Sequence, residues 1–321
     1  MNGRQETNLK IENKIQLLLH DAPKVIKDYS YNFGSKTEKT KMAYLRYVID
    51  FYNYFNHFDI TKLKRSDINK YMEYIRYDKD GNENKTSVRN ARLAGIKDFY
   101  SFLESEGLID VNPTINVKPP RSEEEREIIA LTPDEIKKIK KNILNGVGSH
   151  RAKARQKDWV NRDLAIVSLG CTTGLRCAAI MEINIEDVDL EQNTIKVVEK
   201  GNKVRVIHIG ETTADVIRDW IADRAKLEDG STSALFISNR RKRIAHNSIA
   251  YMLEKYTVGI NKHITPHKMR SSCATNLYDK THDIYLVQEV LGHKNIANTR
   301  RYARISEERK REAADIMDDL V

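Results

Sequence analysis

The sequence has little cysteine, no long apolar run and no targeting signal. Its three cysteines, Cys171, Cys177 and Cys273, lack both the CxxC spacing of a zinc site and the density of a disulfide scaffold, so reduced thiols are expected. No apolar run approaches the ~20 residues that a membrane-spanning helix requires. Residues 1–6 are not followed by the apolar segment of a secretory signal. These absences exclude a membrane protein and predict a cytoplasmic one.

Recognisable metal ligands are also lacking. No carboxylate cluster or histidine pair has the spacing of a metal site, so neither a metal nor another cofactor is expected, and a two-metal nuclease mechanism lacks its parts. Basic residues, in contrast, are in excess. The chain has 55 lysines and arginines against 46 acidic residues, a formal net charge of +9. This balance favours a polyanionic partner such as nucleic acid.

The length of 321 residues predicts two domains. Apolar residues at spacings of three and four predict helices over 35–56, which opens with a capping box at Ser35, over 66–78 and over 86–106. The first domain, 1–112, is therefore expected to be all helical. It includes an N-terminal extension, 1–34, whose apolar stretch has no assigned docking place.

Prolines and acidic residues mark a linker over 113–129, and the catalytic domain is expected over 130–321. That domain begins with a second capping box, Thr132-Pro133-Asp134-Glu135. A helix over 162–182 follows. Next come two apolar runs, 194–198 and 204–209, which flank a Gly-Asn turn and predict a β-hairpin. The predicted fold class is mainly α with a small β-sheet (α+β).

Four short motifs in this second domain carry residues suited to phosphate chemistry. They are Thr173-Gly174-Leu175-Arg176; Lys200-Gly201-Asn202-Lys203; Pro266-His267-Lys268-Met269-Arg270; and Leu291-Gly292-His293, followed nine residues later by Tyr302. An arginine presents a planar fork that grips two phosphate oxygens. His267 and Arg270 lie one helical turn apart, behind Thr265 as N-cap, near the positive end of a helix. Gly292 suits a left-handed helix cap.

In this order the motifs resemble those of the tyrosine recombinase family, which includes phage integrases and Xer-like site-specific recombinases. The resemblance covers nearly the whole chain and implies a helical core-binding domain and a catalytic domain that clamp DNA. It implies that Tyr302 attacks a phosphodiester to form a 3′-phosphotyrosine. Arg176 and Arg270 would stabilise the phosphate, Lys200 would protonate the leaving oxygen, and His267 and His293 would assist. Lys203 is the alternative to Lys200.

The chain departs from the family pattern at one position. The family commonly has an acidic residue three positions after its first arginine, where this chain has Ala179, and Glu182 is a partial substitute only if the helix geometry permits. Two alternatives to a recombinase stay open. One is a type IB topoisomerase, which shares the chemistry, and the other is a DNA-binding protein with a disabled site.

The remaining predictions concern partners. Double-stranded DNA is expected to contact Lys85, Arg89 and Arg92 in the first domain and Arg240, Arg241, Lys242 and Arg243 in the second, with Asn247 or Ser248 as a helix N-cap. The apolar stripe of a C-terminal helix, 306–321, packs either within its own chain or on a neighbour. Similarity to related recombinases favours the neighbour, and hence a tetramer on two DNA sites. Accessory proteins are unknown.

Overall fold

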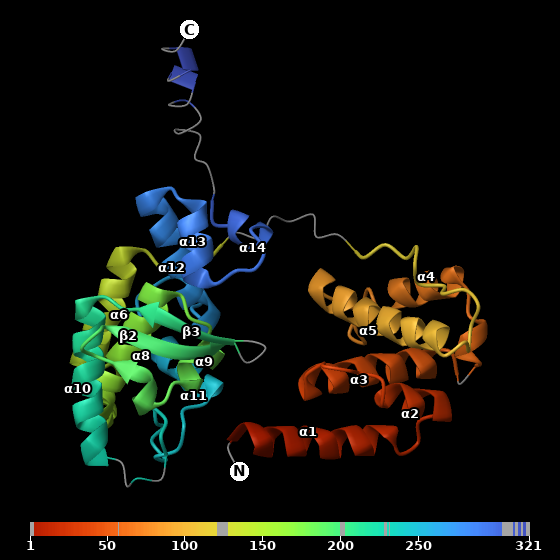
Figure 1. The fold of residues 1–321 in the computed structure, drawn as a ribbon, viewed down its shortest axis with the longest axis horizontal. Coiled ribbons are helices and arrows are strands. Elements are labelled where there is room, and N and C mark those ends of the chain that lie inside the picture. Colours follow the sequence, from red (N-terminus) through yellow and green to blue (C-terminus); the bar gives the residue numbers. More distant parts are fainter. Residues whose placement is uncertain are drawn as a thin grey trace. The chain divides into compact units, whose positions relative to one another are not determined.

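The computed structural model describes residues 3–56, 58–120, 128–199, 203–227, 230, 232–303, 311, 314–315 and 317–318. These residues form helices and one small three-stranded sheet, which confirms the predicted mainly α class (Figure 1). The chain divides into two compact units, Met1–Glu125 and Arg126–Val321. No helix among the described residues is long and apolar enough to cross a membrane.

The regular elements that the structure describes in the first unit are all helices. Its elements are α1 (Gly3–Leu19), α2 (Lys24–Ser30), α3 (Glu38–Tyr54), η1 (Ile60–Lys62), α4 (Arg65–Tyr74) and α5 (Thr86–Ser105). Helix α3 packs against α5 and α1. The predicted helix start at Ser35 is wrong, because Thr37 is the N-cap and its hydroxyl accepts a hydrogen bond from the Thr40 amide.

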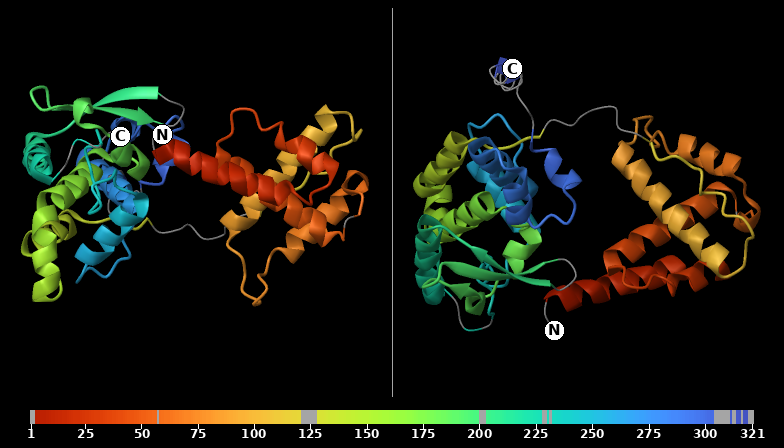
Figure 2. Two further views of the ribbon diagram at one scale, coloured as in Figure 1. Left: turned by 90° about the horizontal axis from the view of Figure 1, so that it is seen from below. Right: turned by 45° about the horizontal axis from the view of Figure 1, so that its top comes forward.

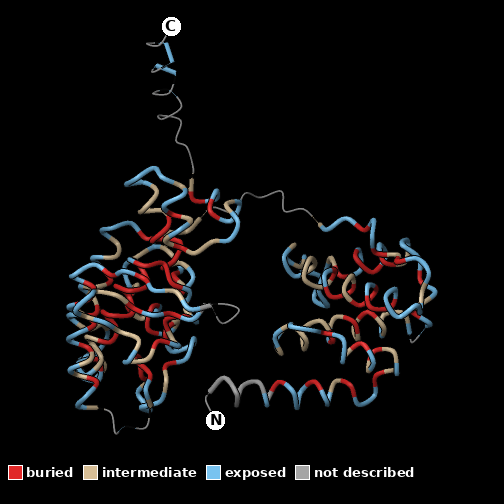
Figure 3. The backbone as a smooth tube through the Cα atoms, viewed as in Figure 1, coloured by how far each residue is buried: buried red, intermediate tan, exposed pale blue. Residues whose placement is uncertain are grey.

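The apolar stretch near the N-terminus packs into the core of the first unit. Ile11, Ile15 and Leu19 lie along one side of α1 and join the core of the first unit, together with Ile26 of α2. Figure 3 shows buried and exposed stretches alternating along the described part of α1. Residues 1–34 are therefore not merely an extension, since their helices complete the core of this unit.

The second unit is built around one buried helix, α8 (Val160–Thr173), which packs against α6, α10 and α12. Its other elements are α6 (Pro133–Asn145), α7 (His150–Gln156), η2 (Lys157–Trp159), α9 (Cys177–Glu182), η3 (Ile185–Asp187), α10 (Glu211–Leu227), α11 (His246–Tyr256), α12 (Pro266–Thr281), α13 (Ile284–Leu291) and α14 (Ala297–Arg300). The capping box at Thr132 is confirmed, since its hydroxyl and the Glu135 carboxylate exchange hydrogen bonds with each other's backbone amides.

The sheet comprises β1 (Val188–Asp189), β2 (Thr194–Glu199) and β3 (Lys203–His208), in that spatial order. Strands β2 and β3 are antiparallel, with Val197 opposite Arg205 and Glu199 opposite Lys203, so the predicted hairpin is confirmed. Strand β2 packs against α9. Figure 2 shows the sheet on one side of the helices of the second unit.

Two helix boundaries in the second unit differ from prediction. The helix expected over 162–182 is interrupted at Gly174, whose φ of +61° is left-handed, so the segment forms α8 and then α9. Helix α11 begins after Ala245, so Asn247 and Ser248 lie inside its first turn and neither is the N-cap. Most of the C-terminal helix expected over 306–321 lies outside the described residues.

Candidate active site

Arg270 holds together the two turns that carry other predicted site residues. Its side chain, on α12, is only 2% exposed. The guanidinium donates to the carbonyl of Gly174 at 2.7 Å and to that of Leu291 at 2.8 Å. Gly174 lies two residues before Arg176, and Leu291 lies two residues before His293. One buried arginine therefore fixes the relative position of the segments that present Arg176 and His293.

The turn before Arg176 requires glycine. A Cβ at Gly174 would lie 2.5 Å from the Leu291 side chain, and the left-handed φ disfavours any other residue. The chain then reaches Arg176, which is the N-cap of α9 and has an exposed side chain. The break in the predicted helix thus places this arginine at the surface of the second unit.

His293 and Tyr302 lie together after α13. The helix ends at Gly292, whose φ of +64° confirms the predicted left-handed cap. The His293 Nδ1 atom lies 2.9 Å from the hydroxyl of Thr299, a fully buried residue. The Tyr302 ring stacks on the imidazole with 6.5 Å between centroids and 14° between planes. Tyr302 is 5% exposed and belongs to a small buried cluster with Ala274, Val287 and Leu291, so its ring lies in the interior beside His293.

Positive charge surrounds both histidines. Burial lowers the pKa of His293 to about 4, and the charges of Arg270, Arg176 and Arg301 act in the same direction. The pKa of His267 is lowered by partial loss of hydration and then by Arg270 and Arg301. Both imidazoles are therefore mainly neutral at pH 7, and the cations around them favour the arrival of an anion. The structure thus brings Arg176, Arg270 and His267 close to His293.

Lys200 lies outside the residues that the structure describes. The strands beside it are described, because β2 ends at Glu199 and β3 begins at Lys203. The choice of Lys200 over Lys203 stays a prediction.

Position 179, where the family commonly has an acidic residue, faces the interior of the second unit. Ala179 is 8% exposed and belongs to the hydrophobic core of the second unit. Glu182, at the end of α9, is exposed to solvent. An alanine suits the buried position without the cost of desolvating a carboxylate.

The predicted DNA-contacting residues of the first unit differ in exposure. Lys85 precedes α5 and is exposed. The Arg89 side chain is 14% exposed and lies 3.9 Å from the Glu83 carboxylate. Arg92 is half-buried near Asp50, where burial raises the pKa of the carboxyl and the Arg92 charge opposes that rise. The two arginines are thus partly committed to contacts inside the unit.

The basic residues of the cluster 240–243 also differ in exposure. Residues 240–242 are exposed in a tight turn. Arg243 points inward and donates to the carbonyls of Met181 at 2.8 Å and Ile183 at 3.3 Å. The backbone next to α9 therefore holds Arg243, while its three neighbours face solvent.

Three residues near the site were not predicted from the sequence. The Thr299 hydroxyl forms a hydrogen bond with the His293 imidazole, and Arg301 lies 5.8 Å from the centroid of the Tyr302 ring. Arg205 of β3 donates to backbone carbonyls of α13. Adjacency to the tyrosine was an available signal for Arg301, whereas the other two contacts depend on tertiary structure.

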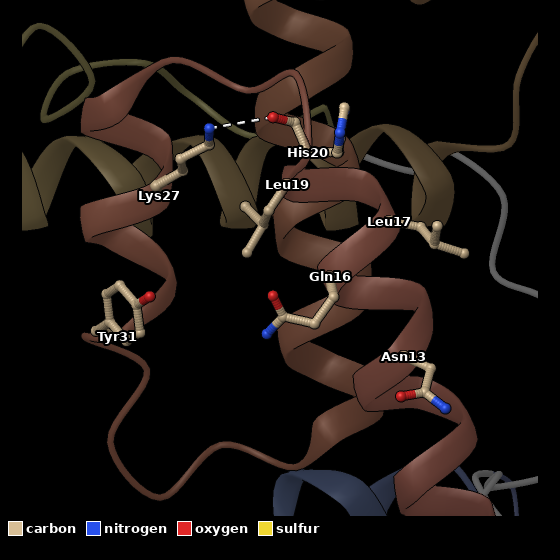
Figure 4. Close-up of a pocket in the computed structure, with 7 residues that line it drawn as sticks. All are labelled: Asn13, Gln16, Leu17, Leu19, His20, Lys27 and Tyr31. Atoms are coloured by element: carbon tan, nitrogen blue, oxygen red, sulfur yellow. Dashed lines mark hydrogen bonds between the residues drawn. The ribbon is translucent and has the colours of Figure 1, made fainter.

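Two further features lie apart from these residues. Among the described residues, no group of three or more histidines, cysteines or acidic residues could hold a metal ion. A pocket between α1 and α2 is lined by Gln16, Leu17 and Tyr31, among others, and Lys27 donates to the His20 carbonyl beside it (Figure 4). It contains none of the predicted site residues.

Comparison with known proteins identifies matches over both units. Residues 130–309 match the model of the phage integrase family, and residues 31–107 match the phage integrase N-terminal SAM-like domain. A protein named tyrosine recombinase XerC from Shewanella amazonensis is 32% identical over 212 residues, 65% of this chain and 67% of that protein. The protein of the same name from Alcanivorax borkumensis is 31% identical over 230 residues, 71% of each chain.

Solved structures with low sequence identity share the fold. The Tn1549 transposon integrase in complex with transposon right end DNA has a TM-score of 0.71 at 18% identity, covering 92% of this chain and 98% of that one. The XerH site-specific recombinase bound to a palindromic difH substrate has a TM-score of 0.70 at 20% identity, covering 88% and 81%. The match to the integrase model over most of the second unit and the identity to XerC proteins lead to one conclusion: the chain belongs to the phage integrase family of tyrosine recombinases.

Proposed function

We propose that this protein is a site-specific DNA recombinase that cleaves and rejoins strands through a 3′-phosphotyrosine intermediate. The observation that carries the proposal is the stacking of Tyr302 on His293, next to the charges of Arg176 and Arg270. A phenol beside neutral imidazoles and arginine charges is suited to attack a phosphate, and this supports the proposal. The names of the XerC relatives favour recombination over the relaxation of DNA by a type IB topoisomerase.

The proposed cleavage step is a transesterification. The Tyr302 oxygen forms a bond to phosphorus, the bond between phosphorus and the 5′-oxygen breaks, and the products are a 3′-phosphotyrosine and a free 5′-hydroxyl. His267 accepts the phenol proton, and Lys200 gives a proton to the leaving 5′-oxygen. The covalent link conserves the bond energy, so a 5′-hydroxyl of a partner strand can reverse the step without ATP.

The two arginines stabilise the negative charge that develops on the pentavalent phosphate. Arg176 is exposed at the start of α9 and can meet a strand from solvent, while Arg270 contributes its charge from inside the unit. His293 hydrogen-bonds the phosphate. Because burial and then the neighbouring arginines lower the pKa of both histidines, His267 is neutral at pH 7 and can accept a proton.

We propose that residues 1–112 form the core DNA-binding domain and that residues 113–129 link it to the catalytic domain. We propose that the two domains both contact double-stranded DNA. The exposed cations Lys85, Arg240, Arg241 and Lys242 are suited to phosphate contacts. Because these contacts are mainly electrostatic, affinity should decrease steeply with salt.

We also propose a tetramer on two DNA sites, joined through the helix over 306–321. The apolar residues of that segment need cover from its own chain or from a neighbour. Deleting 306–321 and measuring the mass of the DNA-bound complex tests this point. A complex that keeps four copies without the segment would assign the helix to its own chain.

The nucleophile is tested by trapping the covalent intermediate. The Tyr302→Phe protein first selects its duplex from a randomised pool, and a nicked form of that duplex is then incubated with each protein. We expect a covalent band on a denaturing gel for the unmodified protein and none for Tyr302→Phe, which lacks the nucleophilic oxygen. Equal binding by both proteins is the control, because phenylalanine keeps the packing of the ring. Binding without a band on the selected duplex would support a DNA-binding protein with a disabled site.

A further inference from the structure

Thr299 contacts both members of the stacked pair formed by His293 and Tyr302. Its hydroxyl lies 2.9 Å from the Nδ1 atom of the His293 imidazole, and its backbone carbonyl accepts a hydrogen bond from the Tyr302 amide at 2.9 Å. Thr299 belongs to α14 and is fully buried. One buried threonine thus connects the imidazole to the backbone of the candidate nucleophile, through two different groups.

The backbone of His293 is fixed separately from its ring. Its amide donates to the carbonyl of Gln288 at 3.0 Å, and its carbonyl accepts from the side-chain amide of Gln288 at 2.8 Å. These bonds leave the ring free to make half a turn about the Cβ–Cγ bond, which exchanges Nδ1 with a carbon. Stacking on Tyr302 is compatible with either orientation, because half a turn keeps the ring plane. The contact with Thr299 therefore selects one orientation of the ring.

The surroundings of the Thr299 hydroxyl decide which atom donates in this contact. Because burial lowers the pKa of His293 to about 4, the ring is neutral at pH 7 and carries one proton, on Nδ1 or on Nε2. Within the part of the chain that the structure describes, the hydroxyl has no hydrogen-bond partner other than this Nδ1. If Nδ1 were the donor, the hydroxyl hydrogen would be buried without an acceptor, which is costly. The hydroxyl therefore donates to Nδ1, and the ring proton is on Nε2.

We propose that Thr299 is a positioning residue that orients His293 so that its Nε2 carries the hydrogen donated to the phosphate. The side chain acts through the imidazole alone, because the contact with Tyr302 uses the backbone carbonyl. With Nδ1 occupied by the hydroxyl and Nε2 protonated, His293 is a donor, and acceptance of the phenol proton is left to His267. This role rests on the proposed function, since it presumes that His293 hydrogen-bonds the phosphate.

The tautomer is tested first, without DNA. In protein with ¹⁵N-labelled histidine, protonated and unprotonated ring nitrogens give well-separated NMR signals, and His293→Gln identifies those of His293. We expect Nε2 to be the protonated nitrogen at pH 7 in the unmodified protein. Thr299→Val keeps the shape of the side chain and lacks the hydroxyl, so the Nδ1 signal should move as its hydrogen bond is lost. Thr299→Ser should leave that signal in place, because it keeps the donor.

Adduct formation on the selected nicked duplex tests the consequence for cleavage. We expect Thr299→Val to be about 10- to 100-fold slower than the unmodified protein, the usual loss when a partner that orients a binding histidine is removed. Thr299→Ser should stay within about threefold, because it keeps the hydroxyl. In a His293→Ala background, Thr299→Val should cause less than about a twofold further loss, because the ring that it orients is absent.

A buried threonine elsewhere in the second unit provides the matched control. Thr213, on α10, is 4% exposed, and its hydroxyl lies 3.5 Å from that of Thr172. Thr213→Val should leave the His293 signals in place and change the rate of adduct formation by less than about threefold. This variant separates the loss of a buried hydroxyl in general from the loss of the one that contacts the imidazole.

Four results would overturn the inference alone. They are an Nδ1-protonated ring in the unmodified protein, an unchanged adduct rate for Thr299→Val, an equal loss in Thr213→Val, and a loss that persists in full in the His293→Ala background. If the unmodified protein forms no adduct on the selected duplex, the proposed function fails and this role fails with it.

Discussion

The two units use their large side chains differently. In the first unit, rings pack against rings, as where Phe51 contacts Phe55, Tyr71 and Tyr100 at centroid distances of 5.2, 5.0 and 6.1 Å. In the second unit, arginines bind the backbone. Those that donate to distant carbonyls are Arg162, Arg205, Arg224, Arg243 and Arg270.

The difference follows from the backbone of each unit. Regular helices satisfy their own amides and carbonyls, so a helical unit needs mainly apolar rings to fill its core. The second unit contains turns such as that at Gly174, whose carbonyls find no partner nearby in the chain. Long arginine side chains supply donors across the fold. Irregular segments that present site residues are thus fixed by hydrogen bonds from distant arginines.

Replacing Arg270 should have the largest effect, because it should lower both the stability of the second unit and the rate of cleavage. Arg270→Ala leaves two buried carbonyls without their donor, which at about 1–3 kcal/mol each predicts a loss of about 2–6 kcal/mol in unfolding free energy. Cleavage should also fall by at least ~10²–10³-fold. Arg176→Ala is the control, because its exposed side chain should affect cleavage and change stability by less than ~0.5 kcal/mol. Both tryptophans, Trp159 and Trp220, lie in the second unit, so their fluorescence in urea reports its unfolding.

Replacing Phe51 should affect the first unit alone. Phe51 is fully buried, and Phe51→Ala should cost that unit about 3–5 kcal/mol through lost apolar contacts and a cavity. Circular dichroism in urea should show an earlier transition for part of the helix signal, while the tryptophan transition is unchanged. Phe58→Ala, at a position 54% exposed, is the matched control and should leave both unchanged. A shift of the tryptophan transition by Phe51→Ala would mean that the units unfold together.

The smallest predicted effect concerns pH. Because the pKa of His293 falls from 6.5 to about 4 on folding, the unfolded chain binds a proton that the folded chain lacks between these values. The His293 contribution to stability is therefore complete above pH 6.5 and is lost as pH falls toward 4. His293→Gln should flatten the decline of the tryptophan-detected unfolding free energy over this range. An identical decline in both proteins would contradict the burial of this imidazole.

Local patterns predicted much of the fold. The capping box at Thr132, the left-handed Gly292 and the β-hairpin each depend on neighbouring residues, and all three are confirmed. The break at Gly174 was missed because the apolar periodicity continues on both sides of it. The Leu291 side chain, more than a hundred residues away, leaves no space for a Cβ at this position, which accounts for the glycine and is invisible in the local sequence.

The residue types of the candidate site are visible in the sequence, whereas the contacts that join these residues are not. Spacing and residue type indicated Arg270 and Tyr302, yet nothing local reveals that Arg270 is buried with its donors on two carbonyls. For the same reason Arg243 was assigned to a basic surface that it only partly joins. An arginine that contacts solvent and one that contacts a distant carbonyl have the same appearance in sequence.

The double attachment of Arg270 bears on how inactive descendants of such an enzyme would arise. A descendant released from selection for strand cleavage would still need Arg270 to hold its turns, whereas it could exchange Tyr302 for phenylalanine and keep the same packed ring. The retention of the arginine is therefore a poor sign of catalytic activity. The tyrosine hydroxyl, which packing does not require, is the better one.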